Sequence, residues 1–391
     1  MNKRNSIYFL FIMLGMLTAF GPFVTDMYLP SLPAMTDYFN TGVSMVQLGL
    51  TFSMFGMAFG QLLFGPLSDK YGRRKPLIFS MAMFLVSTFA CIFAPSIEIF
   101  ILLRLIQGIS AAGGIVIARS IATDKFKAKN LTKAFSIIGS INGIAPVAAP
   151  IIGGTVLGIT GWKGIFAILF FWGILLLFVS LNFKESLSQS RRSKEKLSKA
   201  FNMFKTVLKK KVFVFSTLQM AFTMAILFAY ISASPFIIQK HYHFTPFEFS
   251  LFFAVNAIAL GAGAAISARF KNHEKSLIIS NSGMIICSVF LLFVLSNNLS
   301  IILFESSLLV LCAMMGATFP VTISFALNSA RKQAGTASAI LGASGFLSGS
   351  IVSPIAGLGN ILVPTGITIM ISSLLAAVAA FTAAHYRKNH P

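Results

Sequence analysis

Reactive side chains are scarce in this 391-residue chain, which holds only three Cys, five His and two Trp. Cys91, Cys287 and Cys312 stand alone within apolar runs, a spacing that excludes a disulfide framework or a cysteine metal centre. The histidines lie in connections or in the tail, so they supply no nucleophile with a base and no metal cluster, and an enzyme is not expected. The pair His241-x-His243 is interpreted as incidental rather than as a metal site. No Walker-type loop is present, so the expected energy source is an ion gradient, with no cofactor and no bound nucleotide.

Charged residues make up only 10% of the chain, and 56% of it is hydrophobic, which excludes a water-soluble domain with one core. The hydrophobic residues form twelve runs, each close to the ~20 residues that an α-helix needs to cross a bilayer. These runs cover approximately Ile7–Tyr28, Met45–Leu67, Pro76–Ala94, Ile97–Ser120, Ala134–Gly158, Gly164–Phe183, Val212–Ile238, Phe249–Ala268, Leu277–Leu295, Leu299–Leu327, Ala334–Leu358 and Leu362–Tyr386. We therefore expect twelve transmembrane helices, the first of them uncleaved.

The basic residues follow a strict alternation along the chain. Of the 31 Lys and Arg, 28 fall in every second connection between the apolar runs, whereas only Lys163 and Lys240 lie in the others. Because cytoplasmic connections retain Lys and Arg, both termini are expected in the cytoplasm. The net charge of +21 is spread over seven short connections rather than one surface, so nucleic acid is not an expected partner.

One long basic interruption, residues 184–211, divides the chain six plus six. The predicted organisation is an N-terminal six-helix bundle over 1–183, a basic cytoplasmic linker over 184–211 and a C-terminal six-helix bundle over 212–391. Apolar residues recur in the linker at helical spacing, which fits an amphipathic helix on the inner leaflet or a plain solvated linker. These apolar residues are Leu197, Phe201, Phe204 and Leu208.

The two halves match at an offset of about 201 to 205 residues. Pro150 and Gly154 correspond to Pro354 and Gly357, and Arg104 corresponds to Glu305. Matched span order, loop signs and helix breakers together indicate a duplicated unit. The predicted fold is an all-α membrane protein with twelve transmembrane helices in two pseudo-symmetric six-helix bundles.

Three charged residues in the apolar runs are interpreted as lying at membrane depth: Asp26, Arg104 and Glu305. A charge at membrane depth costs about 2.5 kcal/mol or more, so such residues are functional candidates. Asp26 ends the first span and Arg104 begins the fourth, so both lie in the same third of the membrane and are expected to be able to meet. Arg104 keeps its charge, whereas a carboxyl group can load and unload a proton. The alternatives are that Asp26 caps a helix end before Pro30 and that Glu305 is structural.

A short charged loop, Gly65 to Pro76, separates the second and third spans. Its glycines favour a tight reversal, and a carboxylate beside guanidinium groups makes charge-assisted hydrogen bonds. We interpret this loop as a conformational latch. Its residues are Gly65, Asp69, Gly72, Arg73 and Arg74.

This loop resembles the signature between helices two and three of the major facilitator superfamily. Arg104-Leu105-Ile106-Gln107-Gly108 resembles the helix-four Arg motif of that superfamily, which is associated with proton coupling. The stretch 145–154 resembles its helix-five antiporter motif through Pro146, Pro150, Gly153 and Gly154, although Ala149-Pro150 replaces the usual Gly-Pro. The second-half counterpart of the latch, 269–274, lacks the Asp and Gly pattern. A plain packing function for the glycines and prolines is the alternative.

Within that superfamily, 26–33, 232–237 and 334–338 resemble the twelve-span drug/proton antiporters of the Bcr/CflA branch. The resemblance implies two bundles around a central cavity that opens to each side in turn, lined by spans 1, 4, 7 and 10. It proposes Asp26, Tyr28, Gln107, Tyr230 and Asn256 as contacts to cargo, with an interfacial aromatic belt as the alternative for Tyr28.

The expected function is proton-coupled multidrug efflux at the bacterial cytoplasmic membrane by a monomer. Asp26, Arg104 and Glu305 are expected to take part in proton coupling. The partners are the lipid bilayer, protons and small lipophilic or amphiphilic drugs. A proton-coupled importer of a small nutrient or metabolite is the alternative, since the fold does not set the direction. A membrane enzyme or a channel is disfavoured.

Overall fold

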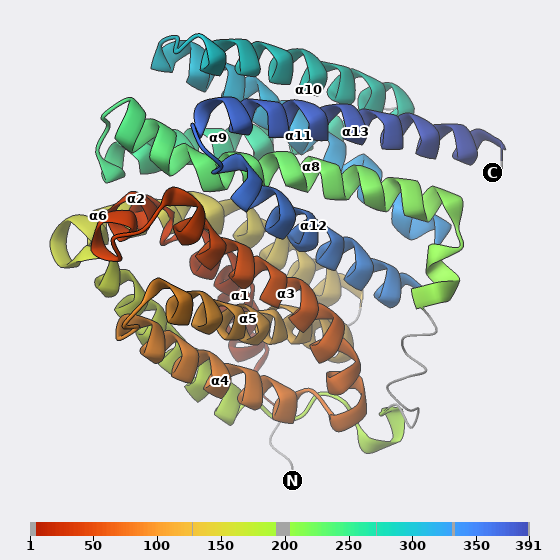
Figure 1. Ribbon diagram of the computed structural model, residues 1–391. Coiled ribbons are helices and arrows are strands. Elements are labelled where there is room, and N and C mark those ends of the chain that lie inside the picture. The colour runs from red at the N-terminus through yellow and green to blue at the C-terminus, as the bar shows by residue number, and fades with distance from the viewer. Residues whose placement is uncertain (1–4, 127, 193–203, 271, 331–332, 390–391) are drawn as a thin grey trace. The chain divides into compact units, whose positions relative to one another are not determined.

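The computed structural model describes residues 5–126, 128–192, 204–270, 272–330 and 333–389, and nearly all of them are helical (Figure 1). The helices are α1 (Ile7–Asp26), α2 (Leu32–Tyr38), α3 (Val43–Tyr71), α4 (Arg74–Ile92), α5 (Ile97–Lys125), α6 (Ala128–Asn182), α8 (Lys211–Phe236), α9 (Pro246–Ser267), α10 (His273–Ser296), α11 (Ile301–Ser329), α12 (Ala334–Ala356) and α13 (Leu362–Asn389), with short turns η1 (Leu29–Ser31), η2 (Gln189–Arg191) and η3 (Ile237–His241). Most of the predicted linker helix, including Leu197 and Phe201, lies outside the described residues.

Eleven helical stretches are long and apolar enough to cross a membrane within the described ranges. One of them, Ile137–Asn182, is 46 residues long and belongs to α6. At Gly161 the backbone of α6 leaves the helical region, with φ 69° and ψ −175°, a conformation that glycine adopts readily. The break falls in the predicted connection between the fifth and sixth spans. Counting its two parts separately turns the eleven candidate spans of the described residues into twelve, the number that the sequence predicted.

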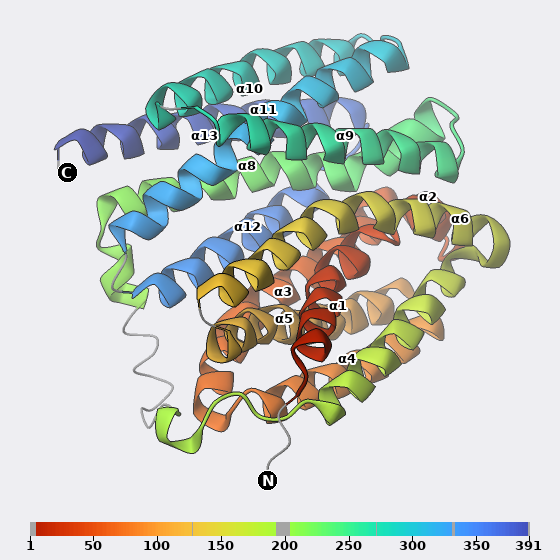
Figure 2. The same cartoon turned by 180° about the vertical axis from the view of Figure 1, so that it is seen from behind.

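The helices pack as two compact units. Unit 1 comprises Met1–Ser31 and Phe52–Ala200, and unit 2 comprises Leu32–Thr51 and Phe201–Pro391. In unit 1, α1 packs against α5 and α6, and α4 packs against the same two helices (Figure 2). In unit 2, α8 packs against α11, α12 and α13, while α10 packs against α11 and α13.

Unit 2 includes α2 and the start of α3, which polar contacts join to α8, to η3 and to Gly357, the residue after α12. Gln47 on α3 is fully buried and donates a hydrogen bond from Nε2 to the carbonyl oxygen of Ser232, at 2.9 Å. At the end of α2, Asp37 pairs with Lys240 at 3.0 Å, although both side chains are exposed. The buried contact thus ties the start of α3 to α8, whereas the solvent-exposed pair adds little.

Backbone crossings between helices repeat in the two units. A Cβ added to Gly56 or to Gly108 would collide with backbone of the facing helix, α5 or α3. The same holds for Gly263 on α9 and Gly316 on α11. Small residues allow such close approach of helices in membranes. The second and fourth helices of each half therefore cross in the same way, which agrees with the predicted pseudo-symmetry.

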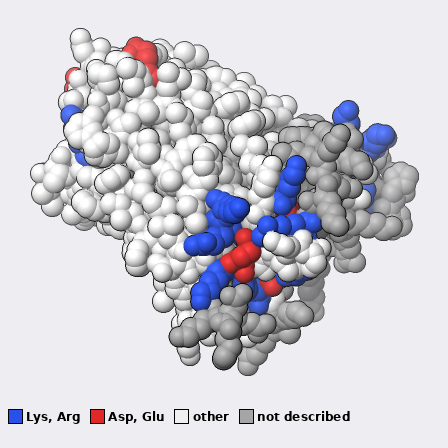
Figure 3. Space-filling view, turned by 90° about the horizontal axis from the view of Figure 1, so that it is seen from below, with Lys and Arg blue, Asp and Glu red and all other residues white. Residues whose placement is uncertain are grey.

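Large apolar side chains are widely exposed in both units. Val86 in unit 1 is 72% exposed, and Ile302 in unit 2 is 73% exposed. Figure 3 shows one face, on which Lys and Arg gather around Asp and Glu in a small area and most of the remaining described surface carries no charge. Such a surface is suited to a lipid environment, and the charges are confined to restricted areas of it.

Candidate functional site

Arg104, on α5, is the largest fully buried side chain of unit 1. Its Nη2 donates to the carbonyl oxygen of Val24 on α1 at 3.0 Å, and its Nη1 donates to the side-chain oxygen of Gln107. Gln107 in turn donates to Thr88 on α4 at 2.7 Å. The guanidinium also lies 4.2 Å from the ring centroid of Tyr28, a favourable cation–π geometry. Two of the proposed cargo contacts, Tyr28 and Gln107, therefore surround Arg104.

Asp26, the last residue of α1, is 6% exposed. Among the described residues its carboxylate accepts one hydrogen bond, from the Thr25 hydroxyl at 2.7 Å. No ion pair joins it to Arg104, although the two residues approach the same stretch of chain, as their positions in the sequence predicted. The guanidinium instead binds the residues two before and two after Asp26: Nη2 donates to the Val24 carbonyl, and the face of the group lies over the Tyr28 ring. Nη1 donates to Gln107, whereas the buried Nε has no acceptor among the described residues.

The predicted antiporter motif lies on α6 and reaches the same part of α1. A Cβ on Gly153 would collide with the backbone carbonyl of Met27, so α6 and α1 touch through their main chains at this position. Pro146 and Pro150 lie inside α6, and Gly154 is buried beside Gly153. The motif thus lies against the residue that follows Asp26.

A second polar cluster lies in unit 2, formed by Tyr230 on α8, Asn256 on α9 and Glu305 on α11. The Asn256 amide donates to the Tyr230 hydroxyl at 3.1 Å and to Glu305 Oε2 at 2.9 Å. We call these three residues the unit 2 cluster. All three were singled out from the sequence, and the structure brings them together.

Close to this cluster, Tyr242 donates its hydroxyl to the carbonyl oxygen of Leu299 at 2.7 Å. Burial, together with the nearby Glu305 carboxylate, raises the pKa of Tyr242 above its ordinary value. Tyr242, in the connection between η3 and α9, therefore lies within electrostatic reach of Glu305.

The latch residues form a network at the junction of α3 and α4. Arg73 is 6% exposed; its Nε donates to Asp124 at 2.9 Å, and its Nη1 donates to Asp69 at 2.5 Å and to Ser68 at 2.8 Å. Burial alone would lower the pKa of Arg73, but the hydrogen bonds and charges of Asp124 and Asp69 raise it. The guanidinium is held by acceptors from α3 and α5.

The reversal itself is shorter than the sequence predicted. Helix α3 continues through Gly65 and Pro66 to Tyr71, and α4 begins at Arg74. Gly72 supplies the turn with a φ of 87°. The additional turn of α3 directs the Ser68 and Asp69 side chains toward Arg73. The hydrogen bonds that Arg73 donates to them stabilise this turn, although it carries charged residues.

Glu185, which follows α6, is a residue that the sequence did not single out as a site residue. Its Oε1 accepts the backbone N–H groups of Arg73, Ser186 and Leu187 at 2.9, 2.9 and 3.0 Å. Its Oε2 accepts the backbone N–H of Arg74 at 3.2 Å, where α4 begins. A Cβ on Gly72 would collide with Oε2, so Gly72 is needed both for the turn and for this carboxylate. The one feature of the sequence that could have pointed to Glu185 is that an acidic residue stands within a strongly basic segment.

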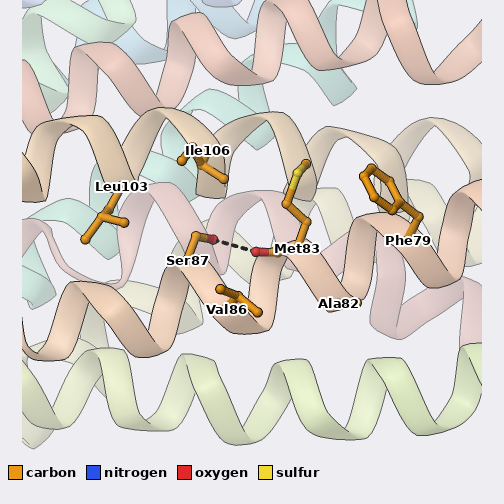
Figure 4. Close-up of a pocket in the computed structure, with 7 residues that line it drawn as sticks. All are labelled: Phe79, Ala82, Met83, Val86, Ser87, Leu103 and Ile106. Atoms are coloured by element: carbon orange, nitrogen blue, oxygen red, sulfur yellow. Dashed lines mark hydrogen bonds between the residues drawn. The ribbon is translucent and has the colours of Figure 1, made fainter.

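A hollow of about 350 Å³ lies elsewhere in unit 1, on the surface between α4 and α5 (Figure 4). Seven residues line it: Phe79, Ala82, Met83, Val86, Ser87, Leu103 and Ile106. The Ser87 hydroxyl bonds to the Met83 and Phe84 carbonyl oxygens of its own helix, so the wall offers no free polar group to cargo. Phe79 and Val86 are largely exposed, which makes the hollow a lipid-facing groove rather than a transport site.

The described residues hold no group of three or more His, Cys, Asp or Glu that could bind a metal. His241 lies against Tyr242, with ring centroids 4.7 Å apart.

Comparison with known proteins identifies relatives of this chain that are transporters. A family model described as the Major Facilitator Superfamily matches residues 11–354. The chain is 34% identical over 387 residues to the uncharacterized MFS-type transporter YdgK of Bacillus subtilis strain 168, covering 97% of this chain and 95% of that protein. It is 28% identical over 271 residues to the bicyclomycin resistance protein homolog of Haemophilus influenzae, covering 69% and 68%.

The fold is also that of a solved transporter. The crystal structure of a D-xylose-proton symporter superposes with a TM-score of 0.79 over 97% of each chain, at 16% identity. At that identity the likeness shows the fold alone. The resemblance inferred from the loop and helix motifs is confirmed: the chain belongs to the Major Facilitator Superfamily and is a multi-pass membrane transporter rather than an enzyme.

Proposed function

We propose that this transporter exports small lipophilic or amphiphilic drugs across the bacterial cytoplasmic membrane in exchange for protons. The similarity to a bicyclomycin resistance protein homolog supports drugs as cargo. The antiporter motif supports export, and the basic residues in alternate connections support an orientation with both termini in the cytoplasm.

One observation carries the proposal. Three elements that the sequence singled out meet at the end of α1, between Val24 and Tyr28. Arg104 binds the Val24 carbonyl and covers the Tyr28 ring, Gly153 touches the Met27 backbone, and Asp26 lies between them. A change at this carboxyl group thus occurs where both α5 and α6 contact α1.

The chemistry follows from the different properties of the two charges. Arg104 keeps its proton at every relevant pH, whereas Asp26 exists with or without one. Protonation removes a negative charge two residues from the carbonyl group that the Arg104 guanidinium binds, and so changes the force between α1 and α5. We propose that cargo binding favours release of this proton and that proton uptake favours return of the empty transporter. Glu305 is the second carboxyl group proposed to take part in coupling.

The latch network is proposed to lie on the cytoplasmic side and to control the alternation of the two six-helix halves, 1–183 and 212–391, which the basic linker connects. Breaking the Arg73 contacts with Asp69 and Asp124 would release the end of α3 from α5. Replacing Asp69 is therefore expected to slow turnover more than it weakens cargo binding.

The test is drug-driven proton movement in everted membrane vesicles, with chloramphenicol as the probe and a pH-sensitive dye inside. Wild-type protein is expected to release protons on drug addition, and Asp26→Asn is expected to abolish this release at unchanged expression. Asp37→Asn, the same change at an exposed carboxylate, is the control and should behave as wild type. Undiminished coupling in Asp26→Asn would remove Asp26 from the mechanism. Proton-dependent accumulation of a labelled sugar or amino acid by intact cells, without chloramphenicol-driven proton release, would favour the importer instead.

A further inference from the structure

The unit 2 cluster has more hydrogen-bond acceptors than donors. The Asn256 amide nitrogen carries two protons, and both are used, one for the Tyr230 hydroxyl and one for Glu305 Oε2. These bonds also fix the orientation of the amide, since a flipped amide would place its oxygen against the carboxylate. Asn256 is 1% exposed, and its Oδ1 accepts no hydrogen bond from any described residue. Glu305 Oε1 is likewise buried without a donor in the described part of the chain.

Glu305 also lacks a positively charged partner. The ion pairs found among the described residues join other carboxylates, and none involves Glu305. Buried polar atoms in proteins are nearly always paired, and a buried charge normally has a counter-charge. Two free acceptors, with no positive charge paired to the carboxyl group, are together complementary to a cation that carries N–H donors.

Aromatic rings border the same cluster. The Tyr230 ring stacks on Phe253 with centroids 5.8 Å apart, and Tyr242 lies 5.9 Å from Phe304, the residue before Glu305. Aromatic faces attract organic cations and also pack against an apolar cargo body. A metal ion such as Ca²⁺ would require six to eight oxygen ligands, far more than the two free oxygens here. The surroundings therefore favour an organic ammonium group.

The matching position of unit 1 carries the opposite charge. Arg104 corresponds to Glu305 at an offset of 201 residues, and the guanidinium would repel a cation placed beside it. Of these two matching positions, only that of Glu305 suits positively charged cargo.

We propose that the unit 2 cluster binds the protonated amine of cationic cargo, with N–H groups donating to Glu305 Oε1 and Asn256 Oδ1 and the apolar body against the neighbouring rings. This inference rests on the proposed drug export and names amphiphilic amines as a cargo class. A proton on Glu305 would remove the counter-charge, so proton and ammonium exclude each other at this carboxylate.

The test uses three ligands that share one ring system: 1-naphthylmethylammonium, its trimethylammonium analogue and its neutral N-acetyl derivative. Binding to the purified full chain in nanodiscs is measured without a gradient. The primary ammonium is expected to bind most tightly, because only it offers both charge and several N–H donors. Glu305→Gln is expected to weaken its binding about 10- to 100-fold and to change N-acetyl binding less than twofold. Asn256→Leu is expected to weaken the primary ammonium more than the trimethylammonium ligand.

Glu98→Gln is the matched control, because Glu98 lies exposed in the first turn of α5 and the change is identical. Binding of the N-acetyl ligand reports that each variant is folded, and Glu305→Asp, which keeps the charge, should retain most of the preference for ammonium. Equal affinity of wild type for all three ligands would overturn the proposal. Displacement of the primary ammonium by millimolar Na⁺ in wild type, lost in Glu305→Gln, would also overturn it in favour of a metal-ion site.

These results are separable from the proposed export. Ammonium selectivity that depends on Glu305, in a protein without drug-driven proton movement, would refute antiport and leave the binding site standing. Drug-driven proton movement with no dependence of ammonium binding on Glu305 would refute the site alone.

Discussion

Replacing Glu185 by Gln is expected to loosen the junction between α3 and α4. The wild-type carboxylate accepts four backbone N–H groups, from Arg73, Arg74, Ser186 and Leu187. The amide keeps one oxygen, which can replace Oε1, but it places an NH₂ group where Oε2 accepts the Arg74 N–H. One backbone donor then faces another donor, and the remaining three lose a charged acceptor.

The size of the effect follows from these bonds. A hydrogen bond to a charged group contributes about 1.5 to 3 kcal/mol and a neutral one about 0.5 to 1.5 kcal/mol. The ion pair with Arg192 adds little, because its 3.7 Å separation and partial exposure allow solvent to screen it. Since bonds to one carboxylate are not additive, we expect a loss of about 2 to 3 kcal/mol in the free energy of opening this junction. That corresponds to about 30- to 150-fold in the opening equilibrium.

Hydrogen–deuterium exchange measures this opening directly. The amides of Arg73, Arg74, Ser186 and Leu187 are expected to exchange faster in Glu185→Gln by that factor, with peptides from α8 to α13 unchanged. Glu98→Gln again serves as the control and should leave the junction peptides unaffected. Wild-type exchange rates at all four amides in Glu185→Gln would refute the reasoning, since they would mean that the carboxylate does not protect them.

Two further substitutions test the α1 region. Gly153→Ala would drive a Cβ into the Met27 carbonyl, so it should lower the free energy of unfolding by about 1 to 3 kcal/mol. Both the unfolding temperature and drug-driven proton release should fall. Gly158→Ala, with open space around the added Cβ, is the control and should match wild type in both assays. Arg104→Lys keeps the charge but loses the forked contact with Val24 and Gln107. The free energy of unfolding is expected to fall by about 2 to 4 kcal/mol. An unchanged midpoint of thermal unfolding would contradict this expectation.

The helices were the most predictable part of the molecule. A span of about 20 apolar residues is visible directly in the sequence, and Gly161 breaks α6 inside the predicted connection. Helix ends were less predictable. Helix α3 runs past its apolar segment to Tyr71, because Arg73 binds Ser68 and Asp69 in the final turn. An apolar pattern carries no information about such a polar extension.

The site was predictable as a set of residues but not as a set of bonds. Charged and amide side chains within apolar spans are rare, which is why Glu305 and Asn256 could be named before their contact was known. The partner of Arg104 could not be found in the same way, because it is the Val24 carbonyl, a group that every residue possesses. Glu185 was missed for the same reason, since its four partners are backbone amides.

The position of Arg104 in the chain bears on how the protein is made. A helix that enters a bilayer with an unpaired guanidinium is costly, at about 2.5 to 3.5 kcal/mol on insertion scales. Val24 on α1 and Tyr28 just after it, like Thr88 on α4, are synthesised before α5 leaves the ribosome. In unit 2, Asn256 likewise precedes Glu305. In both halves, the helix that carries the charged residue is inserted after the helices that carry its partners. The order of translation therefore provides an acceptor for Arg104 and a donor for Glu305 by the time each enters the lipid.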